Sequence, residues 1–188
     1  MTDTEFYKEF IRRLGGDVDA PGLVRTPERM AEAYAFLTAG YEMDIREELN
    51  GAIFEEDYDE MVVVKNIEFF SLCEHHLLPF FGRVHVAYLP EGRLIGLSKI
   101  PRIVDVFSRR LQLQERMTSQ IAKCLMEQLE PMGVGVVCEG MHLCMAMRGV
   151  QQTSSLTTTS AMEGRFKSDA RTRQEFLHLI NMPAVGRT

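Results

Sequence analysis

The feature that most constrains the fold of this chain is a pair of cysteine- and histidine-containing segments that lie far apart in the sequence. The first is SLCEHHLLPF (71–80), and the second is MHLCMAMRG (141–149). Residues i and i+3 of a helical turn share one face, so Cys73 and His76 can approach the same metal ion while His75 points elsewhere. The ligands of a compact zinc finger are close in sequence, and these two segments are not. The fold itself must therefore bring the two segments together.

The second segment is predicted to continue a strand, where residues two apart point to one face, so His142 and Cys144 are expected to face the first segment together. Cys73, His76 and Cys144 supply two thiolates and one imidazole, a set that suits zinc. If these three are the ligands, a fourth position is left for water, as in catalytic sites. If His142 is a fourth ligand, the site is closed and structural. Spacing leaves both alternatives open, together with a buried loop that binds no metal.

A three-ligand site has consequences for the two remaining histidines of these segments. Water bound to zinc can have a pKa of about 7 and is then a nucleophile at neutral pH. His75 and His142 would be suitably placed to transfer protons beside it.

The composition is that of a globular protein with a core. Of the 188 residues, 45% are hydrophobic and 26% are charged. No apolar run reaches the length of a membrane span, and the charged, amphipathic residues 1–16 do not form a signal peptide, so the cytoplasm is the expected compartment. A net charge of −6 argues against nucleic acid as a partner.

The four cysteines are expected to be ligands or buried thiols rather than disulfides, because the cytosol is reducing. Cys124 lies on a predicted helix and is expected in the core, whereas Cys138 matches no role. A redox switch is a further alternative, in which Cys73 and Cys144 form a disulfide when metal is lost.

Several basic residues lie near the metal segments or at helix starts. Lys99 and Arg102 are three apart at the start of a predicted helix capped by Ser98, and a helix N-terminus attracts phosphate. Arg148 follows the second segment, and Arg29 lies in the first turn of an N-terminal helix. Each of them alone would be an ordinary surface charge. Their clustering favours a small polyanionic substrate.

Gln114 and Glu115 open a longer predicted helix. An acidic residue in the first turn of a helix is ordinary capping chemistry. The alternative is a carboxylate that accepts two N–H groups of a guanine edge, and the residues themselves do not decide between the two.

Hydrophobic periodicity divides the chain into an N-terminal helical segment (1–55) and a core (56–188). Predicted helices cover 6–14, 26–37, 45–49, 98–110, 114–129 and 168–180, and predicted strands cover 61–70, 82–90, 133–149 and 154–162. Thr26, Ser98 and Ser168 are the expected N-caps. The tail from Asn181 is expected to fray.

Strands joined by hairpins favour an α+β core with an antiparallel four-stranded sheet and helices on one face. Such a sheet has two open edges that need cover. Closing into a ring with other subunits would remove them.

At these positions the chain resembles the GTP cyclohydrolase I family, zinc-dependent enzymes of pterin and folate biosynthesis. The resemblance extends from about Gly22 to Ile180. It rests on the TPER segment, SLCEHHLLPF, GLSKIPRIVDVFSRRLQLQER, MHLCMAMRG and the region 157–160, in this order. It implies a tunnelling fold in which subunit sheets assemble into a barrel, and a homodecamer of two face-to-face pentamers with active sites at subunit interfaces.

The resemblance also implies a reaction and a role for each residue. The reaction is zinc-dependent hydrolysis of GTP at C8, release of formate and rearrangement to 7,8-dihydroneopterin triphosphate. Cys73, His76 and Cys144 match the zinc ligands, and His75 and His142 match an acid–base pair. The residues that match substrate contacts are Gln114 and Glu115 for guanine, and Ser98, Lys99, Arg102, Arg148 and Arg29 for the ribose and triphosphate, with Ser98 also moving protons.

Two other classes of protein remain as alternatives. A zinc protein that binds a nucleotide without chemistry would have four protein ligands. Another enzyme of the same fold, such as a pterin synthase or a nitrile reductase, is the second alternative, but pterin synthases of this fold bind zinc through three histidines, a set that this chain lacks.

Overall fold

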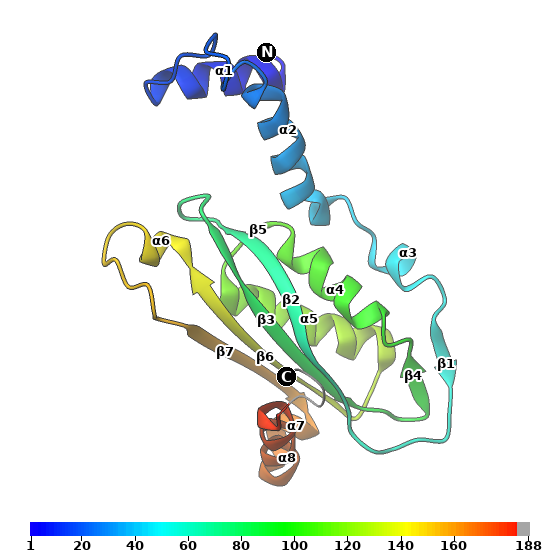
Figure 1. Ribbon diagram of the computed structural model, residues 1–188. Coiled ribbons are helices and arrows are strands. Elements are labelled where there is room, and N and C mark those ends of the chain that lie inside the picture. Colours follow the sequence, from blue (N-terminus) through cyan, green and yellow to red (C-terminus); the bar gives the residue numbers. More distant parts are fainter. Residues whose placement is uncertain (184–188) are drawn as a thin grey trace.

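The computed structural model describes residues 1–183 as an α+β structure (Figure 1). Its main element is a five-stranded sheet with the order β5-β2-β3-β6-β7. These strands are β2 (Val62–Cys73), β3 (Pro79–Leu89), β5 (Leu111–Gln112), β6 (Gly133–His142) and β7 (Thr157–Gly164).

The four long strands are antiparallel, as the sequence predicts. The sheet nevertheless has a fifth strand, because β5 pairs in parallel with the end of β2 through Cys73 and Gln112. Two residues carry no periodicity, so this strand has no signal in the sequence. A separate small sheet pairs β1 (Ile53–Glu55) with β4 (Arg93–Ile95).

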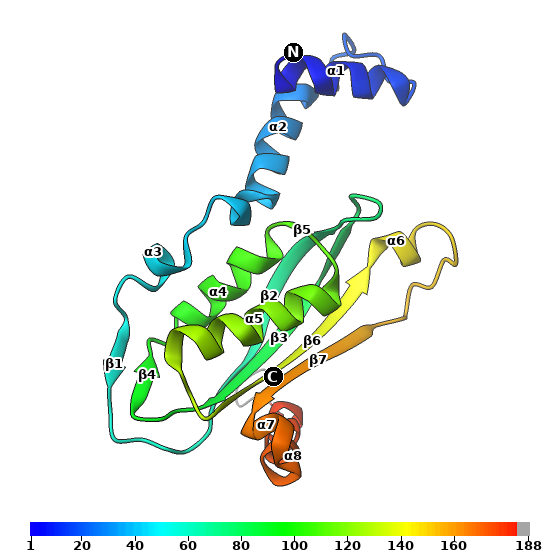
Figure 2. The same ribbon diagram turned by 180° about the vertical axis from the view of Figure 1, so that it is seen from behind.

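Two helices, α4 (Lys99–Ser108) and α5 (Gln114–Leu129), lie across one face of the main sheet (Figure 2). Alternate residues of a strand point to one face, and on β3 these are Val84, Val86 and Tyr88. They belong to the main buried cluster together with apolar residues of both helices, such as Ile103 and Ile121. Each fully buried side chain of this kind stabilises the fold by roughly 1.5–3 kcal/mol.

The prediction that all helices lie on one face is wrong. The short α7 (Arg165–Ser168) and α8 (Ala170–Asn181) belong to a second buried cluster, in which Phe166 and Phe176 pack against Ala87 and Val137 of the sheet. These strand residues point away from α4 and α5. Where these helices pack on the sheet, β3 and β6 have apolar residues at consecutive positions, which is typical of strands buried on both faces.

Other helix ends also differ from the prediction. The N-cap of α8 is Asp169, whose carboxylate accepts a hydrogen bond from the backbone of Arg171, and Ser168 instead ends α7. Ser98 does stand at the N-cap of α4, but its hydroxyl makes no capping hydrogen bond. Thr26 is the first residue of its helix, after the cap residue Arg25.

Helices α1 (Asp3–Arg13) and α2 (Thr26–Leu37) project away from the sheet (Figure 1). The 3-10 turn η1 (Ala39–Tyr41) and α3 (Ile45–Leu49) lie beside α4, and Leu49 belongs to the main buried cluster. A capping box between Thr2 and Glu5 starts α1. The rings of Tyr7 and Tyr34 stack at 5.9 Å and join α1 to α2.

Within residues 1–183, none of the helices combines the length and the apolar character needed to cross a bilayer. The predicted frayed tail falls mostly on residues 184–188, which lie outside the described residues. Asn181 is still the last residue of α8.

The close approach of β3 and β6 depends on a pair of opposed glycines, Gly82 and Gly140. A methyl group added at Gly82 would overlap the carbonyl oxygen of Glu139 on β6. Both groups belong to the backbone, so the strands would have to separate. We expect Gly82→Ala to lower the free energy of unfolding by roughly 1–3 kcal/mol, as overpacked sites do. Urea unfolding measures this.

The matched control is Gly22→Ala, because among the described residues, apart from its two chain neighbours, no atom lies within 4 Å of a methyl group at that position. It should leave the free energy of unfolding nearly unchanged. Equal stability of Gly82→Ala and the unsubstituted protein would contradict the strand spacing described here.

Candidate metal centre and active site

The pairing of β3 with both of its neighbours brings the two cysteine- and histidine-containing segments to the same edge of the sheet. Phe80 of β3 is opposite Ser71 of β2 on one side and opposite His142 of β6 on the other. Cys73 and His142 are the last residues of their strands. The ends of β2 and β6 therefore lie close together, although the chain between them is long.

Three side chains from these strand ends form a group that could hold a metal ion. The ligand atoms of Cys73, His76 and Cys144 all lie within 4.8 Å of one another. Two sulfur atoms in a tetrahedral zinc site are about 3.8 Å apart, given Zn–S bonds of about 2.3 Å, so one ion can contact all three donors. The donor set and its spacing thus fit zinc.

The predicted helical turn of the first segment is confirmed. The backbone N–H groups of His76 and Leu77 both donate to the carbonyl oxygen of Cys73, at 3.2 and 2.8 Å. This turn brings His76 back over Cys73, while His75 is exposed beside it, with the two imidazole rings at a centroid distance of 6.1 Å.

The predicted strand over 133–149 is wrong beyond His142. The chain turns there into the short helix α6 (Leu143–Ala146), which carries Cys144. His142 and Cys144 therefore do not share a strand face. Among the described residues, the metal group contains Cys144 but not His142.

His142 lies next to the metal group in a well-defined environment. Its ring stacks on Phe80 with a centroid distance of 4.5 Å and an interplanar angle of 6°. Its Nε2 is 2.9 Å from Oε1 of Gln114 on α5. Burial lowers the pKa of His142, and the negative charge of Glu115 opposes this only in part. The imidazole is therefore neutral at neutral pH.

Burial raises the pKa of three cysteine thiols, those of Cys124, Cys138 and Cys144. Burial and the adjacent Cys73 thiol raise the pKa of Cys144, so two thiolates here require a cation to stabilise them. Burial raises the pKa of Cys124 to about 11 and that of Cys138 to about 12, and both remain protonated. Cys124 lies in the main core, as predicted, and Cys138 lies there as well.

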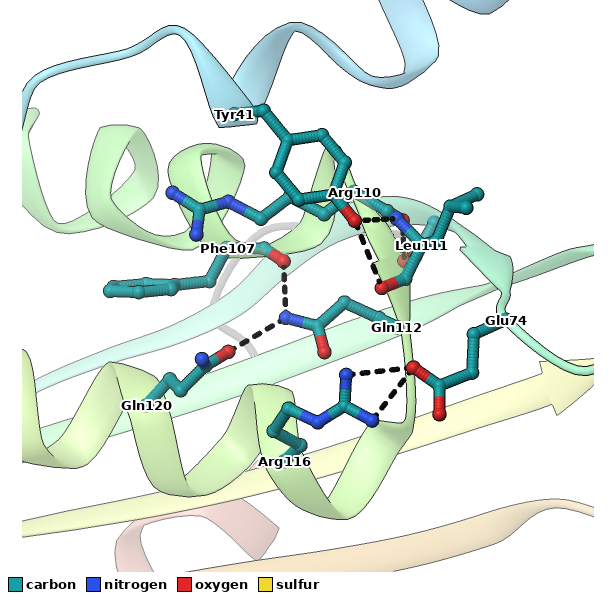
Figure 3. Close-up of polar contacts among 9 residues, drawn as sticks. Tyr41, Glu74, Phe107, Arg110, Leu111, Gln112, Arg116 and Gln120 are labelled. Carbon is teal, nitrogen blue, oxygen red and sulfur yellow. Dashed lines mark hydrogen bonds and ion pairs between the residues drawn. The ribbon is translucent and has the colours of Figure 1, made fainter.

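The turn that carries Cys73 and His76 is supported from α5 and β5 (Figure 3). Both terminal nitrogens of Arg116 are 2.7 Å from Oε2 of Glu74, which is the residue after Cys73. The backbone N–H of Glu74 donates to the carbonyl oxygen of Gln112 at 3.1 Å. The Gln112 side chain is itself held in place, because its amide nitrogen donates to the carbonyl oxygen of Phe107 and to Oε1 of Gln120.

The predicted substrate residues do not all lie near this group. Gln114 is 1% exposed, whereas Glu115 is exposed one position later. Arg148 lies close enough to Cys144 to lower the pKa of its thiol in part. Arg29 is exposed on α2.

Ser98, Lys99 and Arg102 lie at the far end of α4. This helix begins beside β4 and ends beside β5, which pairs with the end of β2 that carries Cys73 (Figure 1). Its ten residues span about 15 Å. There, Nζ of Lys99 donates to the carbonyl oxygen of Glu48 on α3 at 2.9 Å. Arg102 donates to the carboxylate of the same glutamate at 3.1 Å.

Sequence reasoning missed the residues that orient this site rather than form it. In the sequence, Phe80 is only the last residue of the SLCEHHLLPF segment, and Arg116 is only one residue of a predicted helix. Each acts through a long-range contact, Phe80 with His142 and Arg116 with Glu74.

The Glu74–Arg116 contact generates a prediction about metal affinity. Arg116→Met removes the ion pair that holds the turn between Cys73 and His76. Groups that orient metal ligands typically contribute 10- to 100-fold to affinity, and because this contact is indirect we expect a loss of about 10-fold. Competition with a chromophoric chelator measures zinc affinity.

Arg13→Met is the matched control, since Arg13 forms an exposed ion pair with Glu9 on α1. It should not change zinc affinity. If Arg116→Met bound zinc as tightly as this control, the ion pair would have no part in holding the metal turn.

This chain is similar in sequence to several known proteins. A GTP cyclohydrolase 1 of Leptospira biflexa is 58% identical over 173 residues, which cover 92% of this chain and 94% of that protein. One from Campylobacter curvus is 56% identical over 176 residues, covering 94% and 93%. One from Drosophila melanogaster is 54% identical over 175 residues, covering 93% of this chain and 54% of that protein. Residues 4–181 match the family described as GTP cyclohydrolase I. This chain therefore belongs to the GTP cyclohydrolase I family.

Proposed function

We propose that this chain is a GTP cyclohydrolase I, which hydrolyses GTP at C8, releases formate and forms 7,8-dihydroneopterin triphosphate. The observation that carries the proposal is the group of Cys73, His76 and Cys144 at adjoining strand ends, with the neutral His142 beside it. Family membership and relatives named GTP cyclohydrolase 1 support the same activity.

Zinc is the proposed metal, held by Cys73, His76 and Cys144. When bound, it would supply a Lewis acid and a source of hydroxide near neutral pH. Three protein donors suit a catalytic site, because tetrahedral zinc then retains one position for a non-protein ligand. His142 remains outside the donor set, consistent with its bond to Gln114.

The two histidines outside the donor set are the proposed proton carriers. His142, neutral at neutral pH, can accept a proton and pass it to a ring nitrogen of the purine. His75 is exposed beside the metal turn and can exchange protons with solvent. Ser98 is proposed to assist proton transfers during the rearrangement of the ribose.

Glu115 is the proposed residue that recognises guanine. It is exposed at the start of α5, close enough to His142 to influence its pKa. Its carboxylate can accept two N–H groups from the guanine edge. The resemblance also assigns Gln114 to guanine, although all hydrogen-bonding atoms of its side chain have partners within the chain.

The triphosphate is proposed to bind Lys99, Arg102, Arg148 and Arg29. Of these, Arg148 lies near the metal group, while Lys99 and Arg102 lie at the other end of α4. This separation supports a site assembled from two subunits, in which one chain provides the metal end and its neighbour the start of α4.

The same proposal includes the assembly. Within residues 1–183, no further strand pairs with β7, and only the two-residue β5 lies at the other edge of the sheet. Pairing between subunits would complete this arrangement. We propose a tunnelling fold whose sheets close into a barrel, in a cytoplasmic homodecamer of two pentamers. Residues 56–188 would form its catalytic core. Residues 1–55 would form an assembly segment, on which Phe10, Leu14 and Phe36 are exposed.

The direct test of the activity is incubation of the purified protein with GTP, with and without a strong chelator. Formate and the fluorescent pterin obtained by oxidation are measured. We expect both products in equal amounts, their loss with chelator and their return with zinc, because the donor set must hold the metal for hydrolysis. GTP binding without either product would contradict the proposed function.

The two-subunit site predicts complementation between inactive variants. Lys99→Ala disables the phosphate half and His142→Ala disables the metal half. If each site joins the halves of two neighbouring subunits, random mixed oligomers contain intact sites at about a quarter of the interfaces. Co-expressed variants should therefore recover about a quarter of the wild-type turnover. No recovery in mixed oligomers would place a complete site within each chain.

A further inference from the structure

The side chain of Gln114 is unusual because it is buried and fully hydrogen-bonded at the edge of the proposed active site. Its exposed fraction is 1%. The amide nitrogen donates to the carbonyl oxygens of Cys138 at 3.1 Å and Thr157 at 2.9 Å, and to the hydroxyl of Thr159 at 3.2 Å. The amide oxygen is the atom that faces His142.

These contacts determine which end of the amide faces which neighbour. Backbone carbonyl oxygens only accept hydrogen bonds, so the group between Cys138 and Thr157 must be the NH₂ end. Rotating the amide by 180° would oppose its oxygen to two other oxygens at hydrogen-bond distance. The oxygen of Gln114 therefore faces His142.

The orientation of Gln114 determines the tautomer of His142. An amide oxygen is an acceptor, so Nε2 of His142 must carry the hydrogen in the 2.9 Å contact. Stacking on Phe80 holds the plane of the ring at the same time. In neutral imidazole with Nε2–H, the lone pair is on Nδ1, for which no hydrogen-bond partner is found within residues 1–183.

Gly140 on β6 leaves room for the Gln114 amide. A Cβ at this position would lie 2.7 Å from Oε1 of Gln114 and 3.3 Å from the ring of Phe69. The absence of a side chain on β6 thus leaves the space in which the amide reaches His142.

We propose that Gln114 is a positioning residue that holds His142 in the Nε2–H tautomer, so that Nδ1 is the ring nitrogen that exchanges protons with the substrate. A positioning role for Gln114 differs from direct recognition of the guanine base. It deepens the proposed function and rests on it for the identity of the substrate, while the tautomer itself is independent of that identity.

The first test is spectroscopic and needs no turnover. Solid-state NMR of the zinc-loaded protein labelled with ¹⁵N-histidine distinguishes protonated from unprotonated ring nitrogens, and the His142→Gln spectrum identifies the signals of His142. We expect a protonated Nε2 and an unprotonated Nδ1 at neutral pH. In Gln114→Met the Nε2–H signal should shift or split as the tautomers mix. A protonated Nδ1 in the wild type would overturn the proposal.

The second test separates positioning from guanine recognition by kinetics with GTP and with inosine triphosphate, which lacks the 2-amino group. For Gln114→Met we expect kcat to fall about 10- to 100-fold for both nucleotides, since general acid–base catalysis typically contributes 10²–10⁴-fold and depends on geometry. The KM for GTP and the preference for GTP should change little. Loss of that preference with kcat retained would assign Gln114 to guanine instead.

Three controls make the kinetic result specific. Glu115→Gln should reduce the preference for GTP, which shows that the assay detects guanine recognition. Gly140→Ala should lower kcat in the same way as Gln114→Met, because it displaces the same amide. In a His142→Gln background, Gln114→Met should cause no further loss, whereas an additive loss would mean that Gln114 acts independently.

The two proposals can fail separately. If the wild type forms no pterin from GTP, the proposed function is wrong, and the NMR result still decides the tautomer. If the wild type is active but Gln114→Met keeps full kcat, the positioning role is wrong and the proposed function stands.

Discussion

The pairing of β3 with β2 and β6 is the constraint on which the rest of the site depends. It places Ser71, Phe80 and His142 side by side on three adjacent strands. The strands end there, and two short turns carry His76 and Cys144 back over the edge to meet Cys73. A one-residue change of register would turn His142 to the opposite face of the sheet. The glycine pair Gly82 and Gly140 belongs to this same stretch of pairing.

The donors and His142 lie at the same strand ends but have different surroundings. His76 and Cys144 follow the strand ends and meet Cys73, the last residue of β2, whereas His142, the last residue of β6, points to the face covered by α5. There it meets Gln114 and Phe80, which hold it without exposing it fully. The structure thus separates a group suited to binding metal from a neighbouring neutral imidazole suited to moving protons.

The sequence predicted the long strands and most helices, because these depend on local patterns, whereas the choice of three donors rested on the family resemblance. Cys73 and His76 are joined by one turn, and β2, β3 and β6 show strong β-branched runs. The strand predicted through Cys144 was wrong, because apolar residues such as Met145 and Met147 suit either a strand or a turn. The two-residue β5 and the face chosen by α8 depend on tertiary contacts. The contacts of Gln114 also join three elements distant in sequence, so only the fold shows them.

In the proposed metal centre, the adjoining strand ends supply three protein donors and His142 remains outside the donor set. X-ray absorption spectroscopy at the zinc edge of the zinc-loaded protein tests this most directly. We expect two sulfur donors, one imidazole and one further oxygen donor that is not from the protein. Two sulfur donors with two imidazoles would place His142 in the coordination sphere, contradict both the open site and its bond to Gln114, and indicate a closed structural zinc site.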